Sequence, residues 1–277
     1  MYELVQKWIM LFVYIKIKCY NVYEVVMKNI YYYEDFDSDV VISKNQDFKL
    51  KKNYKWVHHN IFYKISSYLL YYIFLFISFI YVKLILHVKI VNKKVLSGKK
   101  NYFLFINHTQ EVGDAFIPAL ITLPKRPYFI VNKANLGIPF LGKLLPMLGA
   151  IVVPEDLHDF KYFKGAINNY EKNHPIVVYP EGHVWPYYTK IRPFKKGVFQ
   201  LAIEENSEIY SATVTYQKRK YSKKPRIVIY IDGGYQVNNL LSKKEKVNDI
   251  INKVRYSMII NSGKSNVEYV TYKKKDN

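Results

Sequence analysis

Short runs of β-branched and aromatic residues alternate with longer helical patterns after Ser97 and Gly98, and this alternation constrains the fold more than any other feature. It is typical of an α/β domain, in which helices connect the strands of one sheet. We therefore expect a central, largely parallel or mixed sheet flanked by helices. The expected strands are 102–106, 128–131, 150–153, 176–179, 210–216 and 227–231, and the expected helices are 115–122, 160–172, 197–205 and 240–260.

One segment before this domain is apolar enough to enter a membrane. Residues 65–82 carry no charge over 18 positions, about the length at which a helix can span a bilayer. Lysines lie on both sides of the segment, so the distribution of positive charge selects no orientation. This symmetry favours a hydrophobic helix that enters one leaflet over one that spans. The other alternative is a helix buried within a soluble domain.

The chain divides into an N-terminal arm (1–60), a hydrophobic membrane-associating helix (61–90), the α/β domain (91–235) and a C-terminal helix with a basic tail (236–277). Residues 1–26 lack the small-residue cleavage site of a secretory signal, and Met27 is an alternative to Met1 as the start of translation. The lone Cys19 excludes an intrachain disulfide and a multi-cysteine zinc site. No three-ligand cluster has zinc-like spacing, so we expect no metal.

The first candidate for chemistry lies directly after the expected strand 102–106. His108 follows the strand end, and Asp114 stands at the start of the next expected helix. A histidine held by a carboxylate can remove a proton from a hydroxyl group, because the carboxylate fixes the tautomer and stabilises the imidazolium. Both residue types are also common in such turns as caps, so the pair alone leaves a structural role open.

The second candidate lies after the expected strand 176–179, where Glu181 and Gly182 stand. Ligands of open α/β sheets bind beyond the carboxyl ends of the strands. Three cations then precede a helix start at Gly197, so backbone amides and mobile charges converge on a place suited to an anion such as phosphate. These cations are Arg192, Lys195 and Lys196. A solvated surface is the plainer interpretation of all three.

Four blocks in this order resemble the glycerolipid acyltransferase family, of which lysophosphatidate acyltransferase is the best-known member. The blocks are 107–114, 133–153, 179–182 and 194–202, and the resemblance covers roughly residues 88–232. Their order and spacing are more specific than any single motif.

The resemblance implies that His108 deprotonates an acceptor hydroxyl for attack on an acyl thioester, that Asp114 orients the ring, and that no covalent acyl-enzyme forms. It implies acyl-CoA or acyl carrier protein as the acyl donor, with no further cofactor. The residues expected to bind substrate are Asn107, Lys133, Glu181, Gly182, Arg192, Lys195, Lys196 and Gly197.

The first block departs from the family pattern. Five residues separate His108 from Asp114, where the family has four. We expect Gly113 to absorb the extra residue by adopting a positive φ. Glu111 is the competing partner for the ring, and we favour Asp114 because the amides of a helix start stabilise a carboxylate.

The anion-binding residues of the family are also incomplete here. His183 stands where the family commonly continues the Pro-Glu-Gly block towards an arginine, and no arginine follows the strand of the second block. We expect Arg192 or the pair Lys195 and Lys196 to take over the phosphate contact.

The principal hypothesis is a membrane acyltransferase of phospholipid biosynthesis that acylates a glycerolipid such as lysophosphatidate, with its catalytic domain on the cytoplasmic face. The net charge of +20 would attract acidic donors and an anionic membrane surface. One alternative is a non-phosphorylated or different lipid acceptor. The other is a non-catalytic, membrane-tethered basic module that binds nucleic acid or anionic lipid. That module gives no reason for the positions of His108 and Asp114, so we expect no nucleic-acid partner.

Overall fold

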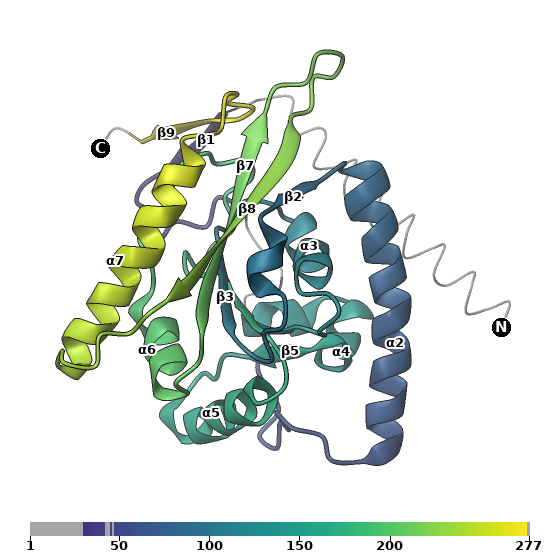
Figure 1. The fold of residues 1–277 in the computed structure, drawn as a ribbon. Coiled ribbons are helices and arrows are strands. Elements are labelled where there is room, and N and C mark those ends of the chain that lie inside the picture. Colours follow the sequence, from purple (N-terminus) through teal and green to yellow (C-terminus); the bar gives the residue numbers. More distant parts are fainter. Residues whose placement is uncertain (1–29, 42–44, 46, 276–277) are drawn as a thin grey trace, which may run out of the picture.

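The computed structural model describes residues 30–41, 45 and 47–275 (Figure 1). The predictions about Met27, Cys19 and the remainder of residues 1–29 lie outside the described residues.

A seven-stranded sheet forms the centre of the described chain, in the order β2-β8-β7-β3-β6-β4-β5. Neighbouring strands are parallel except for the antiparallel pair β7 and β8. The strands are β2 (Lys89–Val91), β3 (Phe103–Ile106), β4 (Tyr128–Val131), β5 (Ala150–Val152), β6 (Ile176–Val178), β7 (Ile209–Gln217) and β8 (Arg226–Tyr235). The predicted α/β fold with a largely parallel or mixed sheet is confirmed.

Helices cover both faces of this sheet. Figure 1 shows α5, α6 and α7 along one side, and α3 and α2 along the other. The helices are α2 (Ile61–Phe79), continued by a π-helical segment (Ile80–Ile85), α3 (Gly113–Ile121), α4 (Leu141–Leu144), α5 (Leu157–Glu171), α6 (Lys196–Glu204) and α7 (Lys243–Ser262). The hydrophobic segment predicted over 61–90 therefore ends its helical part at Ile85, and its last residues enter β2.

The central strand β3 is apolar throughout because it is buried on both faces. Phe103 and Phe105 point into the core under α5, α6 and α7. Leu104 and Ile106 point into the core under α3. Their exposed fractions are all zero, which is the pattern expected of an inner strand in a parallel sheet. The residues that follow Ile106 are consequently held at a well-packed edge of the sheet.

The helix formed by α2 and its continuation has one packed face and one exposed apolar face. It runs for 25 residues and is long and apolar enough to cross a membrane. Ser67, Tyr71 and Ser78 are buried against the domain, and the Ser67 hydroxyl donates to the Met147 carbonyl at 2.6 Å. The outer face exposes large apolar side chains along its length, among them Ile61, Phe62, Ile65, Leu69, Tyr72, Phe76 and Phe79.

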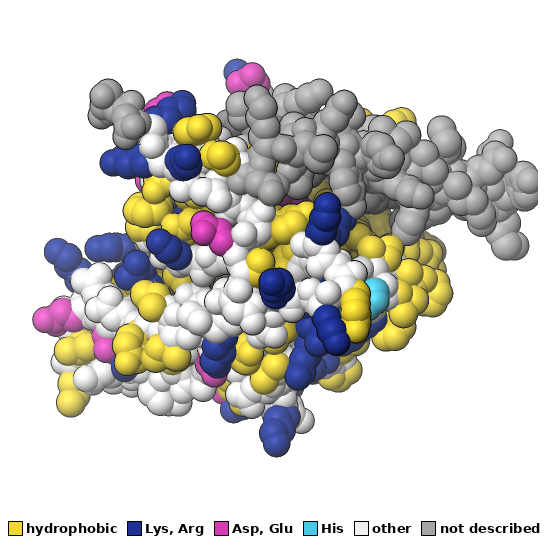
Figure 2. Space-filling model, turned by 90° about the horizontal axis from the view of Figure 1, so that it is seen from above, with side chains coloured by type: hydrophobic (Ala, Val, Ile, Leu, Met, Phe, Trp, Pro, Cys, Tyr) yellow, Lys and Arg dark blue, Asp and Glu magenta, His cyan; other side chains and the backbone are white. Residues whose placement is uncertain are grey.

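Figure 2 shows apolar side chains gathered on the side of the molecule where this helix lies. A helix buried within a soluble domain would not leave such a face uncovered. The alternative of a buried helix therefore does not describe this segment.

A second, two-stranded sheet was not predicted. β1 (Ile30–Tyr33) pairs in parallel with β9 (Thr271–Lys274), which joins the N-terminal arm to the segment expected to be a solvated basic tail. The Tyr31 and Tyr272 rings stack between these strands at 5.4 Å. This pairing brings the acidic residues after β1 close to the Pro-Glu-Gly block.

Candidate active site

His108 and Asp114 are in direct contact at the carboxyl end of β3. The Nδ1 atom of His108 lies 2.7 Å from the Oδ2 atom of Asp114. The histidine side chain is 22% exposed, whereas the carboxylate is 4% exposed. In a neutral imidazole whose Nδ1 donates to a carboxylate, the Nε2 atom carries the lone pair. The pair therefore has a buried acid end and an accessible basic end.

The environment of Asp114 explains how a buried carboxyl is tolerated there. Burial raises the pKa of Asp114, while the contact with His108 and the backbone amides of Gln110 and Thr109 act in the opposite direction. The Gln110 amide donates to Oδ2 at 2.9 Å. A buried carboxylate needs such partners, because desolvation otherwise disfavours its charge.

The turn between the two residues absorbs its extra residue differently from the prediction. Gly113 does not have a positive φ; it is the first residue of α3. The chain already turns helically at Gln110, whose carbonyl accepts the Asp114 N–H at 2.9 Å. Glycine is needed for space, since a Cβ at position 113 would lie 2.9 Å from the Gln110 Cβ. The charge of the competing residue Glu111 instead contributes to raising the pKa of the Tyr31 and Tyr272 hydroxyls.

Tyr179 completes the surroundings of the ring and was missed as a site residue. Its ring stacks on His108 with centroids 4.3 Å apart, and its hydroxyl donates to the Asp114 carbonyl at 2.6 Å. Burial and the nearby Asp114 charge raise the pKa of the Tyr179 hydroxyl, so it remains a protonated donor. A tyrosine at a strand end carried no specific signal in a chain with 28 tyrosines.

Glu181 connects the first block to the second. Its Oε2 atom accepts the backbone N–H of His108 at 3.1 Å, and its Oε1 atom accepts the backbone N–H of Arg192 at 2.9 Å. The side chain is only 1% exposed, so it holds the main chain in place and does not face a substrate pocket. Gly182 follows with φ +83°, a conformation that favours glycine.

Arg192 lies inside the protein, which differs from the predicted contact with an anion. Its Nη2 atom is 3.0 Å from the Oε2 atom of Glu181, and neither side chain is exposed. The guanidinium also donates to the His183 carbonyl and lies 4.7 Å from the ring centroid of Trp185. A buried charge with a buried partner is costly to separate, so Arg192 is not available to a phosphate in this arrangement.

An acidic segment of the arm lies against the neighbouring cations. Asp37 is 2.6 Å from the Nζ atom of Lys195, and Asp39 is 2.5 Å from the Nδ1 atom of His183. Between these two residues, the Ser38 carbonyl accepts the indole N–H of Trp185 at 3.0 Å. We call residues 34–40 the acidic arm. A carboxylate of this arm thus occupies the position where the sequence predicts an anionic ligand.

Two further predicted residues lie exposed at the start of α6. Lys196 is the first residue of the helix, and Gly197 follows in its first turn. A Cβ added to Gly197 would meet nothing within 4 Å, so the glycine leaves open space at this helix end. Asp37 of the acidic arm contacts Lys195, the residue directly before this helix start.

Asn107 and Lys133 have partners within the protein. The Asn107 amide exchanges two hydrogen bonds with the backbone of Val214, at 2.7 and 3.1 Å, and so ties the end of β3 to β7. Lys133 follows β4 and forms an ion pair with Glu155, which follows β5. Asn107 therefore fixes the strand end from which His108 extends.

Among the described residues, the side chains of Asp156, His158 and Asp159 are close enough to hold a metal ion. They lie exposed around the start of α5, where Asp156 accepts the Asp159 N–H at 2.9 Å. This is an ordinary helix cap, and we assign no ion to it.

A protein-family model matches the part of the chain that carries the candidate site. Residues 87–217 match the family model described as Acyltransferase, and this span contains His108, Asp114, Glu181 and Arg192. This match supports the resemblance to the glycerolipid acyltransferase family found in the sequence.

Among solved structures, the chain is similar to the 1-acyl-sn-glycerophosphate (LPA) acyltransferase PlsC from Thermotoga maritima. The sequence identity is 16% and the TM-score is 0.45, and the match covers 72% of this chain and 97% of that chain. A comparison with curated proteins found no match.

Proposed function

We propose that this protein transfers a fatty acyl group from an acyl thioester to the hydroxyl group of a membrane glycerolipid such as lysophosphatidate, in phospholipid biosynthesis. The observation that carries the proposal is the 2.7 Å contact between His108 and Asp114, with the histidine ring partly exposed and the carboxylate buried. This is the arrangement that a general base requires.

In the proposed reaction, the Nε2 atom of His108 accepts the proton of the acceptor hydroxyl as that oxygen attacks the thioester carbonyl carbon. The C–S bond then breaks, and the imidazolium returns the proton to the leaving thiolate. Asp114 stabilises the imidazolium between the two proton transfers. The products are an ester and a free thiol, so the atoms and electrons of the reaction balance without an oxidant or a metal.

Tyr179 and Glu181 are proposed as positioning residues. Tyr179 limits rotation of the His108 ring by stacking, while Glu181 fixes the backbone that carries the ring. Neither residue needs to contact the acceptor for this role. Positioning of this kind lowers the barrier because the reacting atoms are held in place before reaction.

The acceptor phosphate is proposed to bind at the start of α6, near Lys195 and Lys196. Lys195 is already paired with Asp37 of the acidic arm, so a phosphate would have to displace that carboxylate. Both lysines are exposed, and an exposed ion pair of this type contributes little because water already solvates both charges. Displacement by a doubly charged phosphate is therefore inexpensive.

A non-phosphorylated lipid acceptor is the alternative. It is favoured by one observation: Arg192 is buried against Glu181 and unavailable to an anion. In this case the acidic arm would remain on Lys195 during turnover.

The membrane association is proposed to occur through α2. Its inner face packs on α3 and on the turn Pro146–Leu148, so lipid cannot surround it on all sides. A helix in this position fits a one-leaflet insertion in which the exposed apolar face enters the acyl region. We propose that the domain lies on the cytoplasmic face and draws acyl-CoA or acyl carrier protein there through its net charge of +20.

The test is an acyl-transfer assay with the full chain in mixed micelles, using acyl-CoA and acyl carrier protein in parallel. Lysophosphatidate and monoacylglycerol are offered as acceptors, and the esterified product is identified by mass spectrometry. We expect thiol release that depends on lysophosphatidate. Release that depends only on monoacylglycerol would select the alternative acceptor, and absence of release with every pair would contradict the proposal.

A further inference from the structure

A cavity of about 220 Å³ lies at the start of α2, at the opposite end of the strands from His108. Arg126 and His174 of its lining precede the parallel strands β4 and β6. The cavity is therefore at the amino ends of the strands, whereas His108 follows the carboxyl end of β3. We propose that this cavity binds the phosphate group of an anionic phospholipid.

The charge of the lining favours an anion. The 14 lining residues include two permanent cations, Lys64 and Arg126, and none of them is acidic. Burial lowers the pKa of both His58 and His174, so at neutral pH these rings supply hydrogen-bonding atoms more than charge. Four phenols contribute further polar groups, those of Tyr63, Tyr68, Tyr128 and Tyr170.

Arg126 is the buried cation of the cavity. Its residue is 5% exposed, and its Nη2 atom donates to the Ser67 hydroxyl at 2.9 Å and to the Met147 carbonyl at 2.6 Å. Its Nε atom has no hydrogen-bond partner, and no carboxylate pairs with this guanidinium among the described residues. A buried charge without a counter-ion is unfavourable, so a bound anion would supply what the described part of the chain does not.

Three tyrosine rings partly offset this cost. The guanidinium carbon lies 5.1 Å from the ring centroids of Tyr68 and Tyr71, and 5.2 Å from that of Tyr128. Such cation–π contacts hold the guanidinium in place without neutralising its charge. Arg126 thus remains positively charged and fixed at the wall of the cavity.

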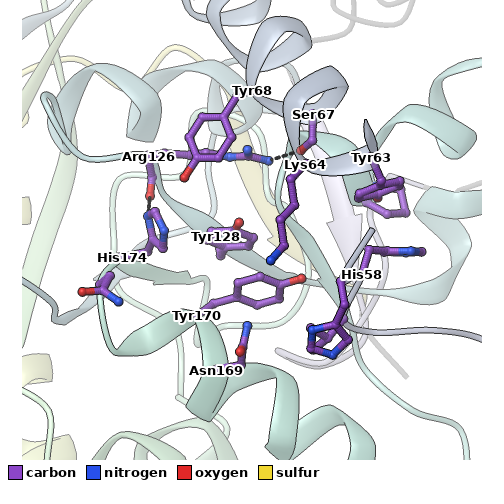
Figure 3. Close-up of a pocket in the computed structure, with 14 residues that line it drawn as sticks. His58, Tyr63, Lys64, Ser67, Tyr68, Arg126, Tyr128, Asn169, Tyr170 and His174 are labelled. Carbon is purple, nitrogen blue, oxygen red and sulfur yellow. Dashed lines mark hydrogen bonds between the residues drawn. The ribbon is translucent and has the colours of Figure 1, made fainter. Parts of the chain in front are cut away.

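Lys64 supplies the second charge from α2. Figure 3 shows its side chain extending from the helix into the cavity, towards the rings of Tyr128 and Tyr170. Lys64 and Arg126 thereby approach the same space from two different elements. Two cations and several hydrogen-bond donors around one small cavity match a phosphate group.

The neighbouring groove indicates a lipid as the source of this phosphate. A second cavity, of about 430 Å³, shares Arg126, Tyr68 and His174 with the first and continues past Leu75 and Leu123 along α2. A ligand with a phosphate at one end and an acyl chain at the other would fill both. The inference rests on the proposed membrane contact of α2 and not on the proposed acyl transfer.

The experiment is native mass spectrometry of the full chain in detergent, with phosphatidylglycerol or phosphatidylcholine added. Lys64→Glu is compared with Lys51→Glu, which makes the same charge change at an exposed position outside the lining. We expect one retained phosphatidylglycerol in the wild type, at least a tenfold weaker retention in Lys64→Glu, and a change below twofold in Lys51→Glu. Phosphatidylcholine should be retained more weakly than phosphatidylglycerol by the wild type.

A comparison with inorganic phosphate distinguishes a phospholipid site from a site for free phosphate. Protection from thermal unfolding by phosphatidylglycerol but not by millimolar phosphate would support a lipid site, whereas equal protection by phosphate alone would overturn the lipid assignment. Equal retention of both lipids, or equal losses in Lys64→Glu and Lys51→Glu, would overturn the site itself. We expect His108→Ala to retain phosphatidylglycerol as the wild type does. A failure of the proposed acyl transfer can therefore be distinguished from a failure of this lipid site.

Discussion

The Oε2 atom of Glu181 lies 3.1 Å from the backbone nitrogen of His108, so a side chain 73 positions away holds the main chain that carries the proposed base. The same carboxylate pairs with the buried Arg192. Glu181 therefore connects the stability of the loop that carries Arg192 to the position of His108.

Replacing Glu181 should cost both stability and activity. Glu181→Gln leaves the Arg192 charge buried without its partner, and breaking a buried pair in this way costs about 3–5 kcal/mol. We expect a lower midpoint in thermal unfolding together with a lower kcat. The double variant Glu181→Gln with Arg192→Gln should lose less than the sum of the single losses. Strictly additive losses would contradict the coupling.

The acidic arm should compete with a phosphorylated acceptor. Removing the Asp37 charge frees Lys195, so Asp37→Asn should lower the KM for lysophosphatidate by up to about fivefold and leave kcat nearly unchanged. Asp47→Asn serves as the control, since Asp47 is exposed and carries the same charge. Steady-state kinetics at low and high salt check this. An unchanged KM in Asp37→Asn would show that the acidic arm does not compete with the acceptor.

Tyr179 should act through its ring more than through its hydroxyl. Tyr179→Phe keeps the stacking on His108 and loses only the hydrogen bond to the Asp114 carbonyl. We expect kcat of this variant to stay within about fivefold of the wild type, the effect of one hydrogen bond of about 1 kcal/mol. Tyr179→Leu should lose at least ten times more than Tyr179→Phe. Equal kcat values for the two variants would argue against a positioning role for the ring.

Glu204 should make stability depend on pH at the acid end. Hydrogen bonds from Lys164, Lys243 and Gln200 lower its pKa from 4.5 to about 2. Because the folded pKa is depressed, the contribution is present above pH 4.5 and is lost as the pH falls towards 2. Glu204 lies at the exposed surface, so screening reduces the contribution to about 1 kcal/mol.

The measurement is the unfolding midpoint of wild type and Glu204→Gln at several pH values. At pH 7 the variant should unfold about 2–4 °C lower. That gap should narrow below pH 4.5. A gap that is constant down to pH 3 would show that Glu204 is not the responsible group.

The sequence predicted the central fold and the contact of the proposed base because both depend on local patterns. The continuous apolar run Phe103–Ile106 indicated a buried strand, and the chemistry at His108 followed from its place after that strand. Asp114 is only six positions away, so a single turn was enough to bring the two side chains together.

The parts that the sequence did not predict depend on long-range pairing. Arg192 looked like a surface cation, since nothing local shows that Glu181 turns inward to meet it. β1 and β9 lie at opposite ends of the chain, so neither could be recognised as a strand without its partner. Gly113 was assigned a positive φ because a bulge was assumed, whereas the close approach of Gln110 is what requires glycine.

The central claim is that His108, oriented by Asp114, removes the proton of the acceptor. The most direct test is the rate of acyl transfer by His108→Ala under saturating substrates, with circular dichroism to show that the fold is kept. We expect a loss of about 10²–10⁴-fold, with a comparable loss in Asp114→Ala. Transfer by folded His108→Ala at the wild-type rate would contradict it.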